Sequence, residues 1–148
     1  MSGFRFSWKS KRNLRQVHPD LQNLAIRTLG VSPIDFGIIE GARSFERQLG
    51  LQKTGASRTL NSRHLRRKSL SLPEFFPPVS HAIDFACYIQ GEIAWDWPLY
   101  EQVGEIFKET AREMEIPITW GGDWKSLRDG PHIELTWDAY PVEIGDQE

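Results

Sequence analysis

An apolar stripe in the second half of the chain constrains the fold more than any other feature. Between Pro98 and about Glu115, apolar side chains recur every three or four positions, at Leu99, Val103, Ile106, Phe107, Ala111 and Met114. This spacing predicts an amphipathic helix with one buried face. The helix is expected to end at Ile116-Pro117, because proline disfavours helical backbone in the residue before it. Other apolar elements must therefore cover this helix.

The remaining apolar segments predict a mixture of helices and strands. Helices are expected from Ser10 to about Val17, from Pro19 to Leu29 and from Arg43 to Gln48, and strands over residues 35–40, 82–89, 117–120 and 132–137. Ser10 is expected to cap the first helix, and Gly30 to end the second. Helices early in the chain and short strands later predict an α+β fold, in which a small antiparallel sheet packs with helices.

Length and composition indicate one domain over residues 1–148. The chain has no Pro/Gly/Ser-rich linker and no apolar run near the ~20 residues that cross a bilayer. The basic N-terminus lacks the apolar segment of a secretory signal, so we expect synthesis in the cytoplasm and no membrane insertion. We also expect a monomer. Cys87 is the only cysteine, which excludes an internal disulfide and a cysteine-based zinc site.

The charges are divided unevenly along the chain. Residues 1–70 carry 14 Lys and Arg against 4 Asp and Glu, whereas residues 71–148 carry 4 against 16. A basic half could attract an anionic polymer, such as nucleic acid or bacterial cell wall. Mutual neutralisation of the two halves in the fold is the alternative.

Three of the four histidines fall in segments that carry other reactive side chains. A catalytic zinc site needs three ligands of the His, Asp or Glu type, an open position, and a carboxylate that can take a proton. His64, Asp84 and His132 can supply the ligands, and Asp129 the base. Strand alternation makes Asp84 point away from the apolar side chains on either side of it in the strand. It also puts Glu134 on the same strand face as His132, where Glu134 could hydrogen-bond the ring nitrogen that does not bind the metal. Spacing alone leaves structural, hydrogen-bonded histidines as an equal alternative, and His18 before Pro19 is expected on the surface.

These residues belong to a series of motifs that resembles the phage endolysin branch of the D-Ala-D-Ala carboxypeptidase and L-Ala-D-Glu peptidase family. The series runs in family order from about residue 14 to residue 140. It comprises Glu40-Gly41-Ala42-Arg43 with Gln48, Thr59-Leu60-Asn61-Ser62-Arg63-His64, His81-Ala82-Ile83-Asp84-Phe85, Trp95-Asp96-Trp97, Ile118 to Lys125, and Asp129 to Leu135.

The resemblance implies a hedgehog/D-Ala-D-Ala peptidase-like fold and hydrolysis of peptidoglycan stem peptides at the L-Ala-D-Glu bond. It implies Zn²⁺ held by His64, Asp84 and His132, with Asp129 as catalytic acid and base. It places three further residues in contact with the substrate, namely Arg43, Gln48 and Ser62. It also implies an endolysin that reaches the wall after release, through a pore made by a holin.

One departure from the family pattern concerns the first two ligands. The family has a compact His-Leu-Thr-Gly-x-Ala-x-Asp motif, whereas 20 positions separate His64 from Asp84 here. The additional segment, roughly residues 66–79, is interpreted as an inserted loop, which a metal site can tolerate because the entropy of loop closure changes slowly with length. The loop either contacts peptidoglycan at the cleft or is a tolerated surface insertion. It also leaves His81 as an alternative first ligand.

Two other functions compete with the endopeptidase. The same zinc site could serve a carboxypeptidase that removes terminal D-Ala. A non-catalytic module that binds the wall or nucleic acid is the second alternative, because basic residues are concentrated at Arg58, Arg63, Arg66, Arg67 and Lys68. No nucleic-acid fold signature accompanies them, so nucleic acid is not expected as a partner.

Overall fold

The computed structural model describes residues 3–57, 59 and 61–143. Its helices are α1 (Trp8–Leu14), α2 (Pro19–Val31), α3 (Phe45–Lys53), α4 (Trp97–Met114) and the short 3₁₀ helix η1 (Gly121–Asp123). Its strands are β1 (Asp35–Glu40), β2 (Ala82–Ile89), β3 (Glu92–Ala94), β4 (Ile118–Trp120) and β5 (His132–Leu135).

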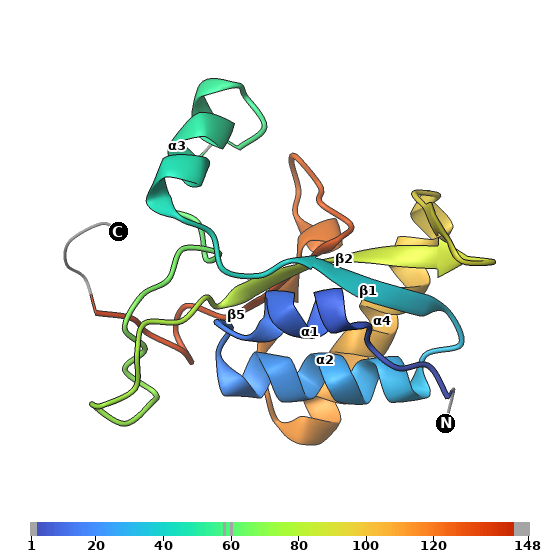
Figure 1. Cartoon of the computed structure of the whole chain (residues 1–148), viewed down its shortest axis with the longest axis horizontal. Helices are drawn as coiled ribbons and strands as arrows, with labels where there is room; N and C mark the ends of the chain where they lie inside the picture. Colours follow the sequence, from blue (N-terminus) through green and yellow to red (C-terminus); the bar gives the residue numbers. More distant parts are fainter. Residues whose placement is uncertain (1–2, 58, 60, 144–148) are drawn as a thin grey trace.

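The strands form one antiparallel sheet in the order β1-β2-β5-β4, and β3 forms a hairpin with the end of β2. The helices α2 and α4 lie together on one face of this sheet (Figure 1). On the other face, α3 and the segment that follows β4 rise away from the strands (Figure 1). The expected α+β class with a small antiparallel sheet is therefore confirmed.

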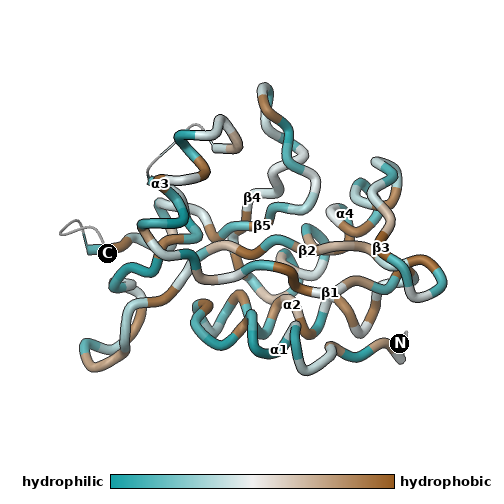
Figure 2. Tube along the Cα trace, turned by 45° about the horizontal axis from the view of Figure 1, so that its top comes forward, coloured by the Kyte–Doolittle hydropathy of each residue, from teal (hydrophilic) through white to brown (hydrophobic). Residues whose placement is uncertain are grey.

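The core fills the space between the sheet and the two long helices. The rings of Phe36, Phe85 and Phe107 lie within 5.5 Å of one another, measured between centroids. They come from β1, β2 and α4, so one aromatic cluster joins both layers. Hydrophobic and hydrophilic residues alternate along α2 in Figure 2, as expected of a helix with one buried face. The strand face that carries Asp84 is left for the site.

The edge of β1 is covered by α1. The Ile38 amide donates to Ser10 Oγ at 3.0 Å, and Asn13 Nδ2 donates to the Ile38 carbonyl at 2.7 Å. These bonds satisfy backbone groups that an exposed edge strand would leave open to other chains. Ser10 is thus a buried residue inside α1, and the predicted cap is wrong: Ser7 Oγ accepts from the Ser10 amide instead.

The predicted bounds of other elements also differ from the structure: α1 ends at Leu14 and β5 at Leu135. The helix expected from Arg43 begins at Phe45 and continues to Lys53, because the hydroxyl of Ser44 accepts the Arg47 amide and caps it. The helix α2 passes through Gly30 and ends at Val31. The strand β3 was not predicted, and it follows a two-residue turn in which Gln90 and Gly91 both have positive φ.

The segment of residues 66–79 is attached to the body of the protein at several points. Arg67 pairs with Val79, and the Leu70 amide donates to the Pro141 carbonyl at 2.9 Å. The segment lies beside the start of α2, on the side of the sheet away from α3 (Figure 1). Its Phe75 side chain is 85% exposed. The tip of the segment therefore does not border the strand face that carries Asp84.

Within the described residues, no helix has both the length and the apolar character needed to span a membrane.

Candidate metal centre

Strand pairing brings Asp84 and His132 face to face. Asp84 lies in β2 opposite His132, the first residue of β5, and opposite Glu40 at the end of β1. Side chains alternate along a strand, so Ile83 and Phe85 enter the core while Asp84 points to the other face. The sequence pattern of β2 therefore dictates the direction of this carboxylate.

His64 reaches the same place through a segment without regular secondary structure. Leu65 forms a parallel bridge with Arg43, whose amide donates to the His64 carbonyl at 2.8 Å. On the other side, the His81 amide donates to the Arg63 carbonyl at 2.8 Å. The segment is thus held between the end of β1 and the start of β2, which positions the His64 ring beside Asp84.

The three side chains form a compact group that could hold a metal ion. Asp84 Oδ1 lies 3.3 Å from His64 Nε2 and 3.3 Å from His132 Nδ1, and all three ligand atoms lie within 4.8 Å of one another. Ligand atoms about 2.1 Å from a tetrahedral ion stand about 3.4 Å apart. The spacing in the structure therefore fits one ion with all three ligands.

Hydrogen bonds on the outer nitrogens select the tautomers that a metal requires. His64 Nδ1 lies 2.8 Å from the Gly41 carbonyl, which only accepts, so this nitrogen carries the proton and Nε2 faces Asp84 with its lone pair. His132 Nε2 lies 2.7 Å from Glu134 Oε1, so Nδ1 is the free nitrogen in the neutral ring. A carboxylate or carbonyl behind a ligand histidine is typical of metal sites.

The electrostatics of the group also favour a cation. Burial alone would raise the pKa of Asp84, but when the two rings are protonated on both nitrogens, the charge of His64 and hydrogen bonds from His132 and His64 bring it well below its ordinary value. Burial alone would lower the pKa of His132, yet hydrogen bonds with Asp84 and Glu134 raise it to about 9. Two carboxylates that favour a proton on the imidazole also favour a metal ion at the same position.

Asp129 lies beside the group without belonging to it. The Asp129 amide donates to the Gly121 carbonyl at 3.0 Å, and a Cβ on Gly121 would lie 2.4 Å from the Asp129 carbonyl oxygen. Only glycine allows this close approach. Burial, and then the charge of Asp84, raise the pKa of Asp129 above its ordinary value. A carboxyl group with a raised pKa is suited to accepting and returning a proton.

The other predicted substrate residues have different surroundings. The Arg43 guanidinium donates to Glu40 through two nitrogens, at 3.2 and 2.6 Å, and to Gln48 Oε1 at 2.6 Å, while its Nη2 lies 3.7 Å from Asp84 Oδ2. Gln48 is fully buried and donates to Ser57 Oγ at 2.8 Å, so here it orients Arg43. Ser62 Oγ accepts the His64 amide at 3.1 Å.

His81 is outside the group, and His18 is not on the surface. His81 Nε2 lies 3.1 Å from Ser69 Oγ, and His18 Nε2 lies 2.9 Å from Ser71 Oγ, so both rings hold the 66–79 segment. His18 is only 1% exposed and stacks edge-on against Tyr140, so its prediction as a surface residue is wrong. Burial lowers the pKa of His81 to about 3, which keeps its ring neutral.

The basic stretch proposed for phosphate contact is not one surface. Arg58 lies outside the described residues. Arg63 is buried, and burial lowers its pKa to about 10. Its guanidinium donates at 3.0–3.1 Å to the carbonyls of Leu135, Thr136 and Tyr140. Arg63 therefore ties the chain after β5 to the sheet and is not available to a phosphate.

Two neighbours of the site were not predicted as functional. Glu40 accepts from both Arg43 and Arg47, and the Trp124 ring packs at a tilt against His132 with ring centroids 5.0 Å apart. Both lie within the motifs of the family resemblance, and that position was the only signal in the sequence. An antiparallel sheet with a His-Asp-His group that could hold one metal ion, beside a carboxylate of raised pKa, is the arrangement expected of a mononuclear metallohydrolase.

Comparison with known proteins identifies the family. The sequence matches the family described as phage L-alanyl-D-glutamate peptidase over residues 1–143. It is 32% identical to the L-alanyl-D-glutamate peptidase of Escherichia phage T5, over 95% of this chain and 98% of that protein. It is also 32% identical to the peptidoglycan L-alanyl-D-glutamate endopeptidase CwlK of Bacillus subtilis, over 90% of this chain and 86% of that protein.

A solved structure gives the same result. The fold matches the crystal structure of the L-Ala D-Glu endopeptidase ChiX of Serratia marcescens with a TM-score of 0.81 and 39% sequence identity, over 94% of this chain and 95% of that chain. The chain therefore belongs to the phage L-alanyl-D-glutamate peptidase family, and the resemblance stated from its motifs is confirmed.

Proposed function

We propose that the protein is a zinc-dependent endopeptidase that hydrolyses the L-Ala-D-Glu bond in the stem peptides of bacterial peptidoglycan. The observation that carries the proposal is the group of His64, Asp84 and His132, whose ligand atoms converge beside Asp129. Two imidazoles and one carboxylate are a ligand set of catalytic zinc sites. The names of the relatives from phage T5 and Bacillus subtilis support the choice of bond.

The chain supplies the remaining chemistry around that ion. Zinc held by His64, Asp84 and His132 would supply a Lewis acid that polarises the scissile carbonyl and lowers the pKa of water. The Asp129 carboxylate takes a proton from the attacking water and passes it to the nitrogen of the leaving Glu residue. The Arg43 guanidinium, whose Nη2 lies 3.7 Å from Asp84 Oδ2, stabilises the negative charge that develops on the carbonyl oxygen. Glu40 and Gln48 hold Arg43 in that orientation.

We further propose that residues 1–148 are a single peptidase domain and that the 66–79 segment is a structural addition. Its hydrogen bonds to the two buried imidazoles of His18 and His81 support a role in attaching the loop. In this proposal the protein acts as a monomeric endolysin. It is released to the wall after synthesis through a pore made by a holin.

Digestion of purified peptidoglycan tests the function. Mass spectrometry of the products separates the proposed endopeptidase, which cuts between L-Ala and D-Glu, from a carboxypeptidase, which releases single D-Ala residues. We expect new N-terminal Glu and no free D-Ala.

Two variants test the assignment of roles. His132→Ala is expected to lose both bound zinc and activity, because it removes a ligand. Asp129→Ala is expected to retain zinc, measured by elemental analysis, and to lose activity. Wall hydrolysis that persists in Asp129→Ala contradicts its role as the base.

A further inference from the structure

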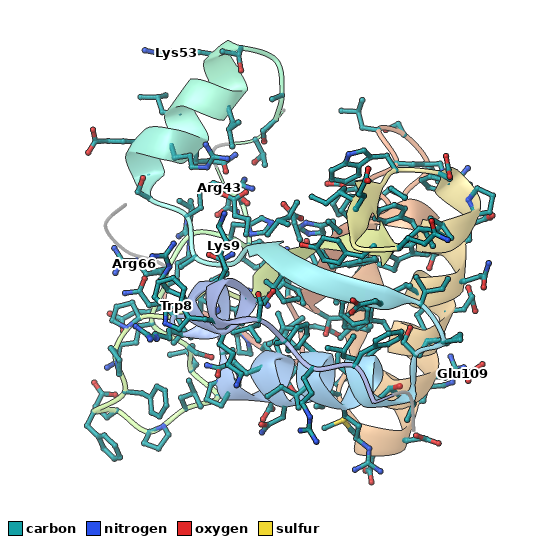
Figure 3. The ribbon with its side chains drawn as sticks, turned by 45° about the vertical axis from the view of Figure 1, so that its right-hand side comes forward. Trp8, Lys9, Arg43, Lys53, Arg66 and Glu109 are labelled. Carbon is teal, nitrogen blue, oxygen red and sulfur yellow. The ribbon has the colours of Figure 1, made fainter. Side chains whose placement is uncertain are left out.

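A polar recess of about 450 Å³ opens beside the metal group, and its two arginines, Arg12 and Arg47, have no role in the reaction described above. It lies where α1, the end of β1 and the start of α3 come together. The polar side chains that line it are Arg12, Asn13, Gln16, Glu40, Arg47 and Asp84. Figure 3 shows the same region, with Arg43 between α1, which carries Trp8 and Lys9, and α3, which carries Lys53. Asp84 belongs to both places, so a ligand of the metal group extends directly into the recess.

Hydrogen bonds distinguish the arginines around the recess. Arg43 is engaged by Glu40 and Gln48 through all three of its nitrogens. Arg47 uses only Nε on Glu40, at 2.7 Å, which leaves both Nη groups on a side chain that is 58% exposed. The Arg12 guanidinium stacks on Trp8 at 4.7 Å, and no carboxylate pairs with it in the part of the chain that the structure describes.

The charge of the recess favours an anion. Glu40 accepts from both Arg43 and Arg47, so its negative charge is compensated within the wall. A metal ion held by Asp84 would compensate that carboxylate as well. The unpaired donors of Arg12 and Arg47 then remain, and a planar guanidinium binds a carboxylate through two parallel hydrogen bonds. The recess therefore offers a carboxylate site next to the reacting bond.

The proposed substrate carries such a group in the right part of the molecule. A glutamyl residue has two carboxyl groups, and the peptide uses one of them to continue, so the other is free. The free group belongs to the residue whose nitrogen is released, a few bonds from the scissile carbonyl. Later residues of the stem can bring a carboxylate of their own.

We propose that Arg12 and Arg47 form a subsite for a free carboxylate of the stem peptide on the leaving-group side of the cut bond. The subsite makes the enzyme select acidic over amidated stems. The inference rests on the proposed function, because it takes its substrate from that reaction.

Four synthetic stem peptides test the subsite. They contain the L-Ala-D-Glu bond and differ in two positions, where the free carboxyl group of Glu and the C-terminal carboxyl group are each left as acid or converted to amide. For the wild type we expect kcat/KM to fall roughly tenfold or more when the bound carboxylate becomes an amide, since a charge-assisted hydrogen bond is lost. The position that produces the fall identifies the carboxylate.

Arg12→Gln removes the charge at an exposed helix position and should not disturb the fold. We expect the ratio of kcat/KM between acid and amide peptides to approach one in Arg12→Gln and to recover partly in Arg12→Lys. The matched control is Arg27→Gln on α2, which is also exposed and lies outside the recess, and it should keep the wild-type ratio. A ratio in Arg12→Gln equal to that of the control overturns the inference.

Binding to the Asp129→Ala protein separates the two proposals. Calorimetry with zinc-loaded Asp129→Ala, with and without Arg12→Gln, measures the preference for acid peptides without turnover. A wild type that cuts none of the peptides contradicts the proposed function, while a preference that is lost with Arg12 still supports the subsite. Equal binding of acid and amide peptides, or no binding of either, overturns the subsite even if hydrolysis is normal.

Discussion

Removal of the carboxylate behind His132 should weaken metal binding in two graded steps. Glu134 Oε1 accepts from His132 Nε2 at 2.7 Å, and the Glu134 side chain is only 13% exposed, so the bond is shielded from water. Glu134→Gln keeps an oxygen that can accept the same proton but removes the charge. Glu134→Ala removes both. Loss of such a partner lowers metal affinity by about 10–100-fold.

We therefore expect zinc affinity to fall by about tenfold in Glu134→Gln and about 100-fold in Glu134→Ala, which corresponds to about 1.4 and 2.7 kcal/mol. Competition with a chromophoric chelator at pH 7.5 measures the dissociation constants. Glu109→Gln is the control, because Glu109 is exposed on α4, far from Arg43 in Figure 3. Zinc affinities of both Glu134 variants within a factor of two of the control would refute the tautomer argument for His132.

Three further predictions concern stability and the approach of His64. Burial lowers the pKa of His81 to about 3, so the unfolded chain binds more protons than the folded one between about pH 3 and 6.5. The free energy of unfolding is therefore at its maximum above this window and decreases as the pH falls through it, by about 2 kcal/mol at pH 5. Urea unfolding at pH 7 and pH 5 should show this loss in the wild type and a smaller one in His81→Asn; equal losses would contradict it. Gly41→Ala places a Cβ 2.1 Å from the Asn13 carbonyl oxygen. It should lower the unfolding free energy, measured in urea, by about 1–3 kcal/mol, and should also lower zinc affinity, measured by chelator competition. Phe107→Ala empties the centre of the aromatic cluster and should lower the unfolding free energy by about 3–5 kcal/mol in urea; a loss below 1 kcal/mol would contradict the packing.

The regular elements of the fold could be predicted where a residue pattern is local. The apolar stripe of α4 and the alternation in β2 are each visible within one segment, and both elements lie within a residue or so of their expected bounds. The strand β3 has only three residues, too few for a clear alternation, and its signal is the Gln90-Gly91 turn before it. Ser10 resembles a cap in the sequence, and its actual bond to Ile38 joins residues far apart in the chain.

The site was predictable to the extent that strands direct side chains. Alternation gives the direction of Asp84 and the shared face of His132 and Glu134. It cannot distinguish His64 from His81, because the choice depends on the pairing of Leu65 with Arg43, a contact between segments without regular structure. The burial of His18 depends in the same way on Tyr140, at the other end of the chain.

Anomalous diffraction at the zinc edge, from crystals grown with one equivalent of zinc, tests the metal assignment most directly. We expect one strong peak in contact with His64 Nε2, Asp84 Oδ1 and His132 Nδ1, and loss of that peak in His132→Ala. A principal peak at another location, or one in contact with His81 in place of His64, would contradict this expectation.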